Sequence, residues 1–98
     1  MSAFGLIGTP LTHSFSKRYF EEKFKQLGLY ISTYNLFDIA LEADLKVFKE
    51  RNTQLTGLNV TIPYKRSVLP LLEEISDEAR AVGAVNTIKI VNGYWYGY

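Results

Sequence analysis

Short apolar runs alternate with amphipathic segments along most of the chain, and this alternation limits the fold more than any other feature of the sequence. Runs rich in β-branched and aromatic residues at 4–7, 31–37 and 57–62 predict strands. Helices are expected from about Ser16 to Gly28 and over Asp44–Arg51. Strands that alternate with helices build a mainly parallel sheet covered on both faces. The pattern therefore predicts an α/β fold with three layers, α/β/α.

The second half of the chain is expected to add two helices and a hairpin. Pro63 suits the first turn of a third helix, which Pro70 would distort or end early. A short fourth helix is expected between Ser76 and Gly83. Strands at 84–91 and 94–96 flank the dipeptide Asn92-Gly93, a strong hairpin signal. We therefore expect an antiparallel hairpin at the C-terminal end of the sheet.

The composition excludes several classes of function. The 98 residues suffice for one domain and not two, and a net charge of +1 gives no basic surface for nucleic acid. The absence of cysteine and the single histidine, His13, argue against disulfides, thiolate chemistry and a protein-held metal ion. No G-x-G-x-x-G motif is present to bind a dinucleotide. With neither a secretory signal nor a membrane-spanning run, we expect a cytoplasmic protein.

Two hydroxyl side chains precede the first predicted helix, in His13-Ser14-Phe15-Ser16. Free N–H groups and the helix dipole favour an anion at such a position, so Ser14 and Ser16 could hold a carboxylate. Local sequence also allows a simpler interpretation, in which Ser16 only caps the helix and His13 is structural.

The segment Asn59-Val60-Thr61-Ile62-Pro63-Tyr64-Lys65 carries polar groups at the end of a predicted strand. Alternation directs Asn59 and Thr61 to the same face, at the carboxyl end where open α/β sheets bind ligands. Lys65 would lie in the first turn of the next helix, where the dipole would favour a neutral amine suited to proton transfer. Lys65 could equally be a solvated surface charge. Asn86, at the mouth of a later strand, could bind a ligand hydroxyl or serve as a turn residue.

Four segments, in this order and at these separations, resemble the shikimate dehydrogenase family over the whole chain. They are Gly5-Leu6-Ile7-Gly8 with Pro10, His13-Ser14-x-Ser16, Asn59-Val60-Thr61-x-Pro63-x-Lys65 and Gly83-Ala84-Val85-Asn86-Thr87. The resemblance implies that residues 1–98 are the substrate-binding domain. NADP would be bound by a C-terminal Rossmann domain that this chain lacks. The complete enzyme would interconvert 3-dehydroshikimate and shikimate, a step toward chorismate and the aromatic amino acids.

The resemblance also implies a role for each matching residue. Ser14 and Ser16 would hold the substrate carboxylate. The ring hydroxyls would be bound by Asn59, Thr61, Lys65 and Asn86. Lys65 would also be the catalytic lysine. A quinate/shikimate dehydrogenase and a stand-alone, non-catalytic carboxylate-binding module remain as alternatives.

The sequence departs from the family pattern at three points. Lys17 and Phe20 stand where many members carry proline and histidine. The family's catalytic aspartate lies in an Asn-Thr-Asp motif just after the hairpin, whereas this chain ends at Tyr98. The cofactor domain is missing as well. We therefore expect a part of a longer protein, which folds but does not catalyse on its own.

Overall fold

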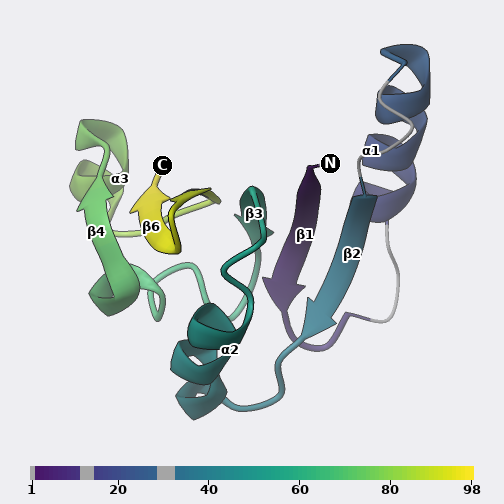
Figure 1. Cartoon of the computed structure of the whole chain (residues 1–98). Coiled ribbons are helices and arrows are strands. Elements are labelled where there is room, and N and C mark those ends of the chain that lie inside the picture. The colour runs from purple at the N-terminus through teal and green to yellow at the C-terminus, as the bar shows by residue number, and fades with distance from the viewer. Residues whose placement is uncertain (1, 12–14, 29–32) are drawn as a thin grey trace.

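The computed structural model describes residues 2–11, 15–28 and 33–98, which build one mixed sheet with helices around it (Figure 1). The six strands lie in the order β2-β1-β3-β5-β6-β4. They span β1 Ala3–Gly8, β2 Thr33–Asp38, β3 Gly57–Val60, β4 Leu72–Ile75, β5 Thr87–Val91 and β6 Tyr94–Gly97. The helices are α1 Phe15–Gln26, α2 Leu45–Arg51 and α3 Asp77–Val82, with 3₁₀ turns η1 Glu42–Asp44 and η2 Leu69–Leu71.

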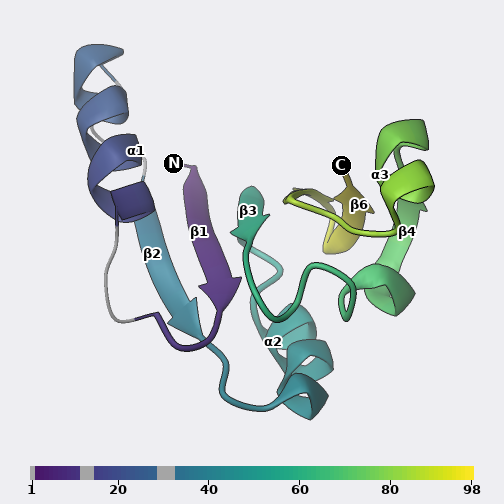
Figure 2. The same ribbon diagram turned by 180° about the vertical axis from the view of Figure 1, so that it is seen from behind.

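The strand directions place the helices on both faces of the sheet. β1 pairs in parallel with β2 on one side and β3 on the other. The connections β1-α1-β2 and β2-α2-β3 therefore run in opposite directions, and right-handed crossovers then put α1 and α2 on opposite faces. Figures 1 and 2 show α1 beside β2 at one edge of the sheet and α3 beside β4 at the other. The predicted three-layer α/β/α fold is confirmed.

The core lies on the face of the sheet that α2 and α3 cover. Alternate strand residues, including Ile7, Leu58, Ile88 and Trp95, are almost wholly buried there. They belong to one cluster with Leu45 of α2 and Ala79 of α3. The Cα radius of gyration, 13.1 Å, is that of a folded domain of about 100 residues.

The C-terminal hairpin confirms the sequence prediction. β5 and β6 pair antiparallel, and the turn residues have φ of 53° at Asn92 and 80° at Gly93. Two successive positive φ angles define the turn whose twist matches the flanking strands, and Asn-Gly adopts it readily. The short helix α3 is also as expected, because the Ser76 side chain accepts a hydrogen bond from Ala79 N at 3.1 Å.

The prediction of a helix after Pro63 is wrong. Residues 62–68 form turns, η2 follows, and β4 pairs in parallel with β6. Pro70 offers no N–H to continue an α-helix from the preceding residues, and it lies instead near the start of the 3₁₀ turn η2. Residues 72–75 instead complete the edge of the sheet. The strand predicted over 57–62 likewise ends earlier, at Val60.

Within the described part of the chain, no helix is both long and apolar enough to cross a membrane.

Candidate functional site at the carboxyl ends of β1 and β3

The carboxyl ends of β1 and β3 lie side by side and place Thr61 just beyond them. Ile7 and Val60 are register partners, and Thr61 N donates to Ile7 O at 3.0 Å. Gly8 makes this close approach possible, since a Cβ built there would lie 2.4 Å from the Thr61 methyl carbon. The absence of a side chain at Gly8 therefore gives Thr61 its position at the edge of the sheet.

Backbone hydrogen bonds bring Lys65 and Asn86 to the same edge. Val60 N donates to Asn86 O at 2.7 Å, and Val85 N donates to Lys65 O at 2.8 Å. Asn86 directly precedes β5, whose first residue is the register partner of Asn59. Four of the predicted site residues, Asn59, Thr61, Lys65 and Asn86, thus come from chain segments that meet at one end of the sheet.

A tight turn carries the chain from Thr61 to Lys65. Tyr64 N donates to Thr61 O at 3.0 Å and closes the turn. The Tyr64 ring is buried, and its hydroxyl donates to Ile39 O just after β2. Burial raises the pKa of the Tyr64 hydroxyl, and the carboxylates of Glu42, Asp38 and Asp44 raise that pKa further. Tyr64 is therefore a neutral anchor for the turn at neutral pH.

Lys65 does not lie at the start of a helix, so the predicted influence of a helix dipole on its amine is wrong. The residue lies in a series of turns that ends at η2. Its side chain is half-buried. Whatever chemistry Lys65 performs must therefore come from its neighbours at the sheet edge and from its ligand.

Asp38, at the end of β2, fixes the loop that follows β1. Its carboxylate accepts a hydrogen bond from Leu11 N at 3.1 Å and another from the Thr9 side chain. These two hydrogen bonds lower the pKa of Asp38 below its ordinary value of 3.8, and the bond from Thr9 has the larger effect. Thr9 N also donates to Ile62 O at 3.2 Å. The loop is thereby tied to both β2 and the turn that carries Lys65.

The two predicted serines follow Leu11 in the sequence. Ser14, with His13, lies outside the described residues. Ser16 is in the first turn of α1, and the structure describes its backbone but not its side chain. Their proposed contact with a carboxylate stays a prediction.

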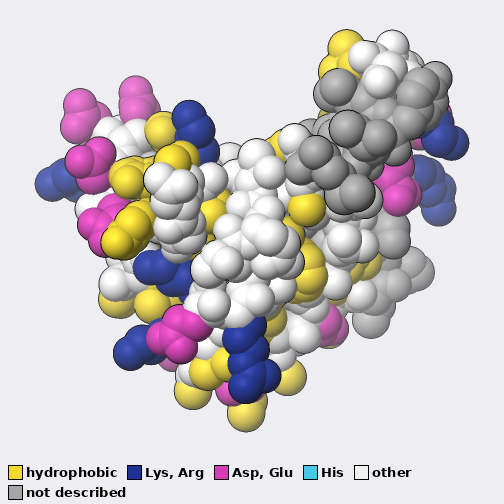
Figure 3. Space-filling model, viewed as in Figure 1, with side chains coloured by type: hydrophobic (Ala, Val, Ile, Leu, Met, Phe, Trp, Pro, Cys, Tyr) yellow, Lys and Arg dark blue, Asp and Glu magenta, His cyan; other side chains and the backbone are white. Residues whose placement is uncertain are grey.

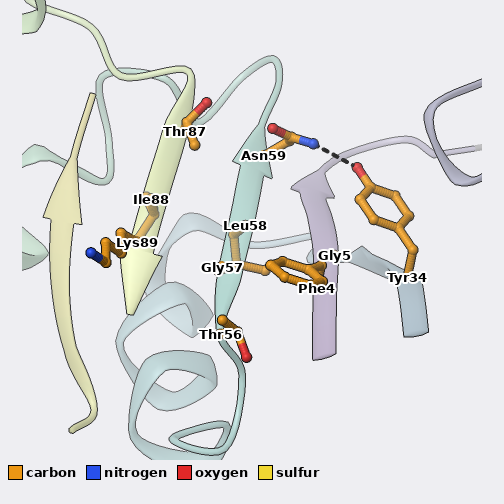
Figure 4. A pocket seen from close by; sticks show the side chains of 10 residues that line it. All are labelled: Phe4, Gly5, Tyr34, Thr56, Gly57, Leu58, Asn59, Thr87, Ile88 and Lys89. Carbon is orange, nitrogen blue, oxygen red and sulfur yellow. Dashed lines mark hydrogen bonds between the residues drawn. The ribbon is translucent and has the colours of Figure 1, made fainter. Parts of the chain in front are cut away.

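A cavity of about 470 Å³ lies against one face of the sheet and reaches the site at Asn59 (Figure 4). The Asn59 Nδ2 group donates a hydrogen bond to the Tyr34 hydroxyl at 3.0 Å. Asn59 lies on β3 and Tyr34 on β2, so this hydrogen bond passes over β1, the strand between them. Of the predicted site residues with described side chains, only Asn59 lines this cavity. The lining residues are Phe4, Gly5, Tyr34, Thr56, Gly57, Leu58, Asn59, Thr87, Ile88 and Lys89.

Charged groups of both signs are interspersed around the margin of the face shown in Figure 3. The described residues include no group of three or more histidine, cysteine, aspartate or glutamate side chains that could hold a metal ion. The candidate residues themselves carry amide, hydroxyl and amine groups, which can form hydrogen bonds.

Sequence reasoning missed Tyr34 and Asp38. Neither belongs to a motif, and each contributes through a side chain that reaches another strand or loop. Asp38 directly follows the strand predicted over 31–37, and this was the one available signal, because polar residues at such positions lie at the ligand-binding edge of open α/β sheets.

An α/β domain that gathers hydrogen-bonding side chains at the carboxyl ends of parallel strands belongs to the class that binds small polar ligands. Residues 6–88 match the family model described as the shikimate dehydrogenase substrate binding domain. The chain belongs to this family, and the resemblance inferred from its four sequence segments is confirmed.

Individual relatives agree with the family model. The NADP(+)-dependent shikimate dehydrogenase of Staphylococcus haemolyticus is 42% identical over 97 residues, which are 97% of this chain and 35% of the relative. Shikimate 5-dehydrogenase from Thermus thermophilus, solved in complex with NADP(H) and shikimate, is 36% identical with a TM-score of 0.89, covering 99% of this chain and 37% of that one. Quinate dehydrogenase from Corynebacterium glutamicum, solved in complex with NAD, is 36% identical with a TM-score of 0.88. The match covers 99% of this chain and 36% of the quinate dehydrogenase chain. The chain thus spans about a third of the length of the relatives that it matches.

Proposed function

We propose that residues 1–98 are the substrate-binding domain of an NADP-dependent shikimate dehydrogenase that interconverts 3-dehydroshikimate and shikimate. The observation that carries the proposal is the meeting of Asn59, Thr61, Lys65 and Asn86 at one end of the sheet. These side chains can donate and accept hydrogen bonds to a polyhydroxylated ring. Family membership supports the choice of this ligand over other small polar molecules.

In the proposed complex, each polar group of the ligand has a protein partner. Ser14 and Ser16 bind the carboxylate of shikimate. The amides of Asn59 and Asn86 and the hydroxyl of Thr61 bind ring hydroxyls. These contacts hold the reacting carbon in one orientation, which is the main contribution of a binding domain to the rate.

Lys65 is the proposed catalytic residue. When shikimate is oxidised, the reacting carbon loses a hydride and its hydroxyl loses a proton. The Lys65 amine accepts that proton in oxidation and returns it in reduction, together with an aspartate beyond Tyr98. NADP, when bound to the remainder of the protein, accepts or supplies the hydride. The cytoplasmic location expected from the sequence is part of this proposal.

An NMR titration of the isotope-labelled 98-residue chain with shikimate tests the proposed binding site. We expect saturable shifts at the amides of Asn59, Thr61, Lys65 and Asn86 at millimolar ligand, with little change at Val47 on the exposed side of α2. Cyclohexanol, which lacks the carboxylate and the other hydroxyls, is the control ligand. A folded chain whose spectrum shikimate leaves unchanged would contradict a preformed site.

A quinate/shikimate dehydrogenase is the second candidate, because the solved quinate dehydrogenase matches this chain about as well as the solved shikimate enzyme does. Assays of the complete protein with both acids, each with NADP and NAD, distinguish the two. We expect the highest kcat/KM with shikimate and NADP. A preference for quinate would favour the second candidate.

A further inference from the structure

The side chains of Tyr34 and Asn59 meet across the strand that separates them (Figure 4). Tyr34 lies on β2 and Asn59 on β3, and β1 runs between them in parallel with both. Phe4 of β1 is the register partner of both Tyr34 and Gly57. Because alternate residues share a face, Tyr34, Phe4, Gly57 and Asn59 project to the same side of the sheet.

Few side chains could make this contact. Two strand spacings separate β2 from β3, a distance of roughly 10 Å. A residue on β2 therefore needs a long, stiff side chain with a polar end to reach the Asn59 amide. Tyrosine meets all three requirements, whereas phenylalanine lacks the hydroxyl and serine or threonine is too short.

The contact holds the Asn59 amide in one position at the ligand site. Tyr34 is only 2% exposed, so its ring is held by packing and its hydroxyl is a fixed partner for the amide. Nδ2 of Asn59 donates to that hydroxyl at 3.0 Å. The other end of the amide lies toward the side of Thr87 on β5 (Figure 4). Because a tyrosine hydroxyl can both donate and accept, the contact fixes where the amide lies, and the other end of the amide is left at the sheet edge for a hydrogen bond.

We propose that Tyr34 is a positioning residue that holds the Asn59 amide in place, so that the end of the amide turned away from Tyr34 forms a hydrogen bond with a ring hydroxyl of the substrate. The inference rests on the proposed function and names a residue outside the predicted site on which the ligand contact of Asn59 depends.

Steady-state kinetics of the complete enzyme with shikimate test this role. Tyr34→Phe removes the hydroxyl and keeps the buried ring. We expect kcat/KM to fall about fivefold, the usual effect of one neutral hydrogen bond, with most of the change in KM. Tyr94→Phe, which removes a half-exposed hydroxyl from β6 of the same sheet, is the matched control and should leave kcat/KM within twofold.

A double-mutant cycle with Asn59→Ala separates positioning from a general structural effect. If Tyr34 acts through Asn59, Tyr34→Phe should change kcat/KM by less than twofold once Asn59 is alanine. An equal loss in both backgrounds, or a kcat/KM for Tyr34→Phe equal to that of the wild type, overturns the inference. Thermal unfolding checks that the unfolding midpoint of Tyr34→Phe lies close to that of the wild type. A large drop in this midpoint, together with an equal loss of kcat/KM in both backgrounds, also overturns the inference.

The wild-type assay distinguishes this inference from the proposed function. If the complete wild-type enzyme does not oxidise shikimate, the proposed function fails and the inference fails with it. If the wild type is active and the cycle shows no coupling, only the role of Tyr34 fails.

Discussion

Lys65 is held at the sheet edge by its backbone, while its side chain stays available to a ligand. Its carbonyl accepts a hydrogen bond from Val85 N at 2.8 Å, next to Asn86. If the amine moves the proton, Lys65→Ala in the complete enzyme should lower kcat by at least about 100-fold, with a much smaller change in KM. Arg66→Ala, the exposed neighbouring cation, is the control for a loss of charge and should stay near wild-type kcat. An unchanged kcat for Lys65→Ala would remove Lys65 from proton transfer.

At the scale of single residues, local sequence selected the candidate site residues but not the contacts that support them. Asn59 was placed near the end of a strand from strand alternation, and Asn86 at the mouth of a later strand from its own short segment, and both are short-range signals. Tyr34 and Asp38 act on residues more than 20 positions away in the sequence, as the contacts with Asn59 and Leu11 show. Such contacts depend on strand order and register, which the local pattern does not determine.

The loop between β1 and α1 depends on the charge of one carboxylate. The Thr9 hydroxyl and Leu11 N stabilise the ionised form of Asp38 and lower its pKa in the folded state. A lowered pKa contributes stability above the unfolded value near 3.8, and that contribution is lost as the pH falls through the folded pKa. We expect Asp38→Asn to flatten the dependence of folding stability on pH below about pH 4.

Urea unfolding of the wild type and of Asp38→Asn between pH 2 and 7 measures this effect. Asp77→Asn, which alters an exposed carboxylate in the first turn of α3, is the control for the loss of a negative charge. Identical pH profiles for the wild type and Asp38→Asn would show that the loop does not depend on the carboxylate.

The elements themselves were predicted unevenly. α3 and the hairpin carry their own stop and start signals, Ser76, Gly83 and Asn92-Gly93, and these were confirmed. β4 was missed because its apolar residues suited a helix equally well, and short apolar runs do not distinguish the two structures. Residues 72–75 form a strand because they pair with β6, and this pairing is not visible in the local sequence.

On the scale of the whole molecule, binding and catalysis are expected to separate. The 98 residues contain no dinucleotide-binding glycine motif. We expect the purified chain to fold and bind shikimate without reducing NADP, whereas the complete enzyme does both. Absorbance at 340 nm reports NADPH formation, and circular dichroism confirms folding. Sustained turnover by the purified 98-residue chain would contradict this division of labour.

The order of strands in the sheet differs from the order in which the ribosome makes them. β4 is synthesised before β5 and β6, yet its neighbour in the sheet is β6, the last strand of the chain. During translation β4 therefore has no strand to pair with until the β5–β6 hairpin has emerged from the ribosome. A synonymous codon change that slows translation between residues 76 and 94 would lengthen this interval and the exposure of the nascent chain to chaperones and proteases.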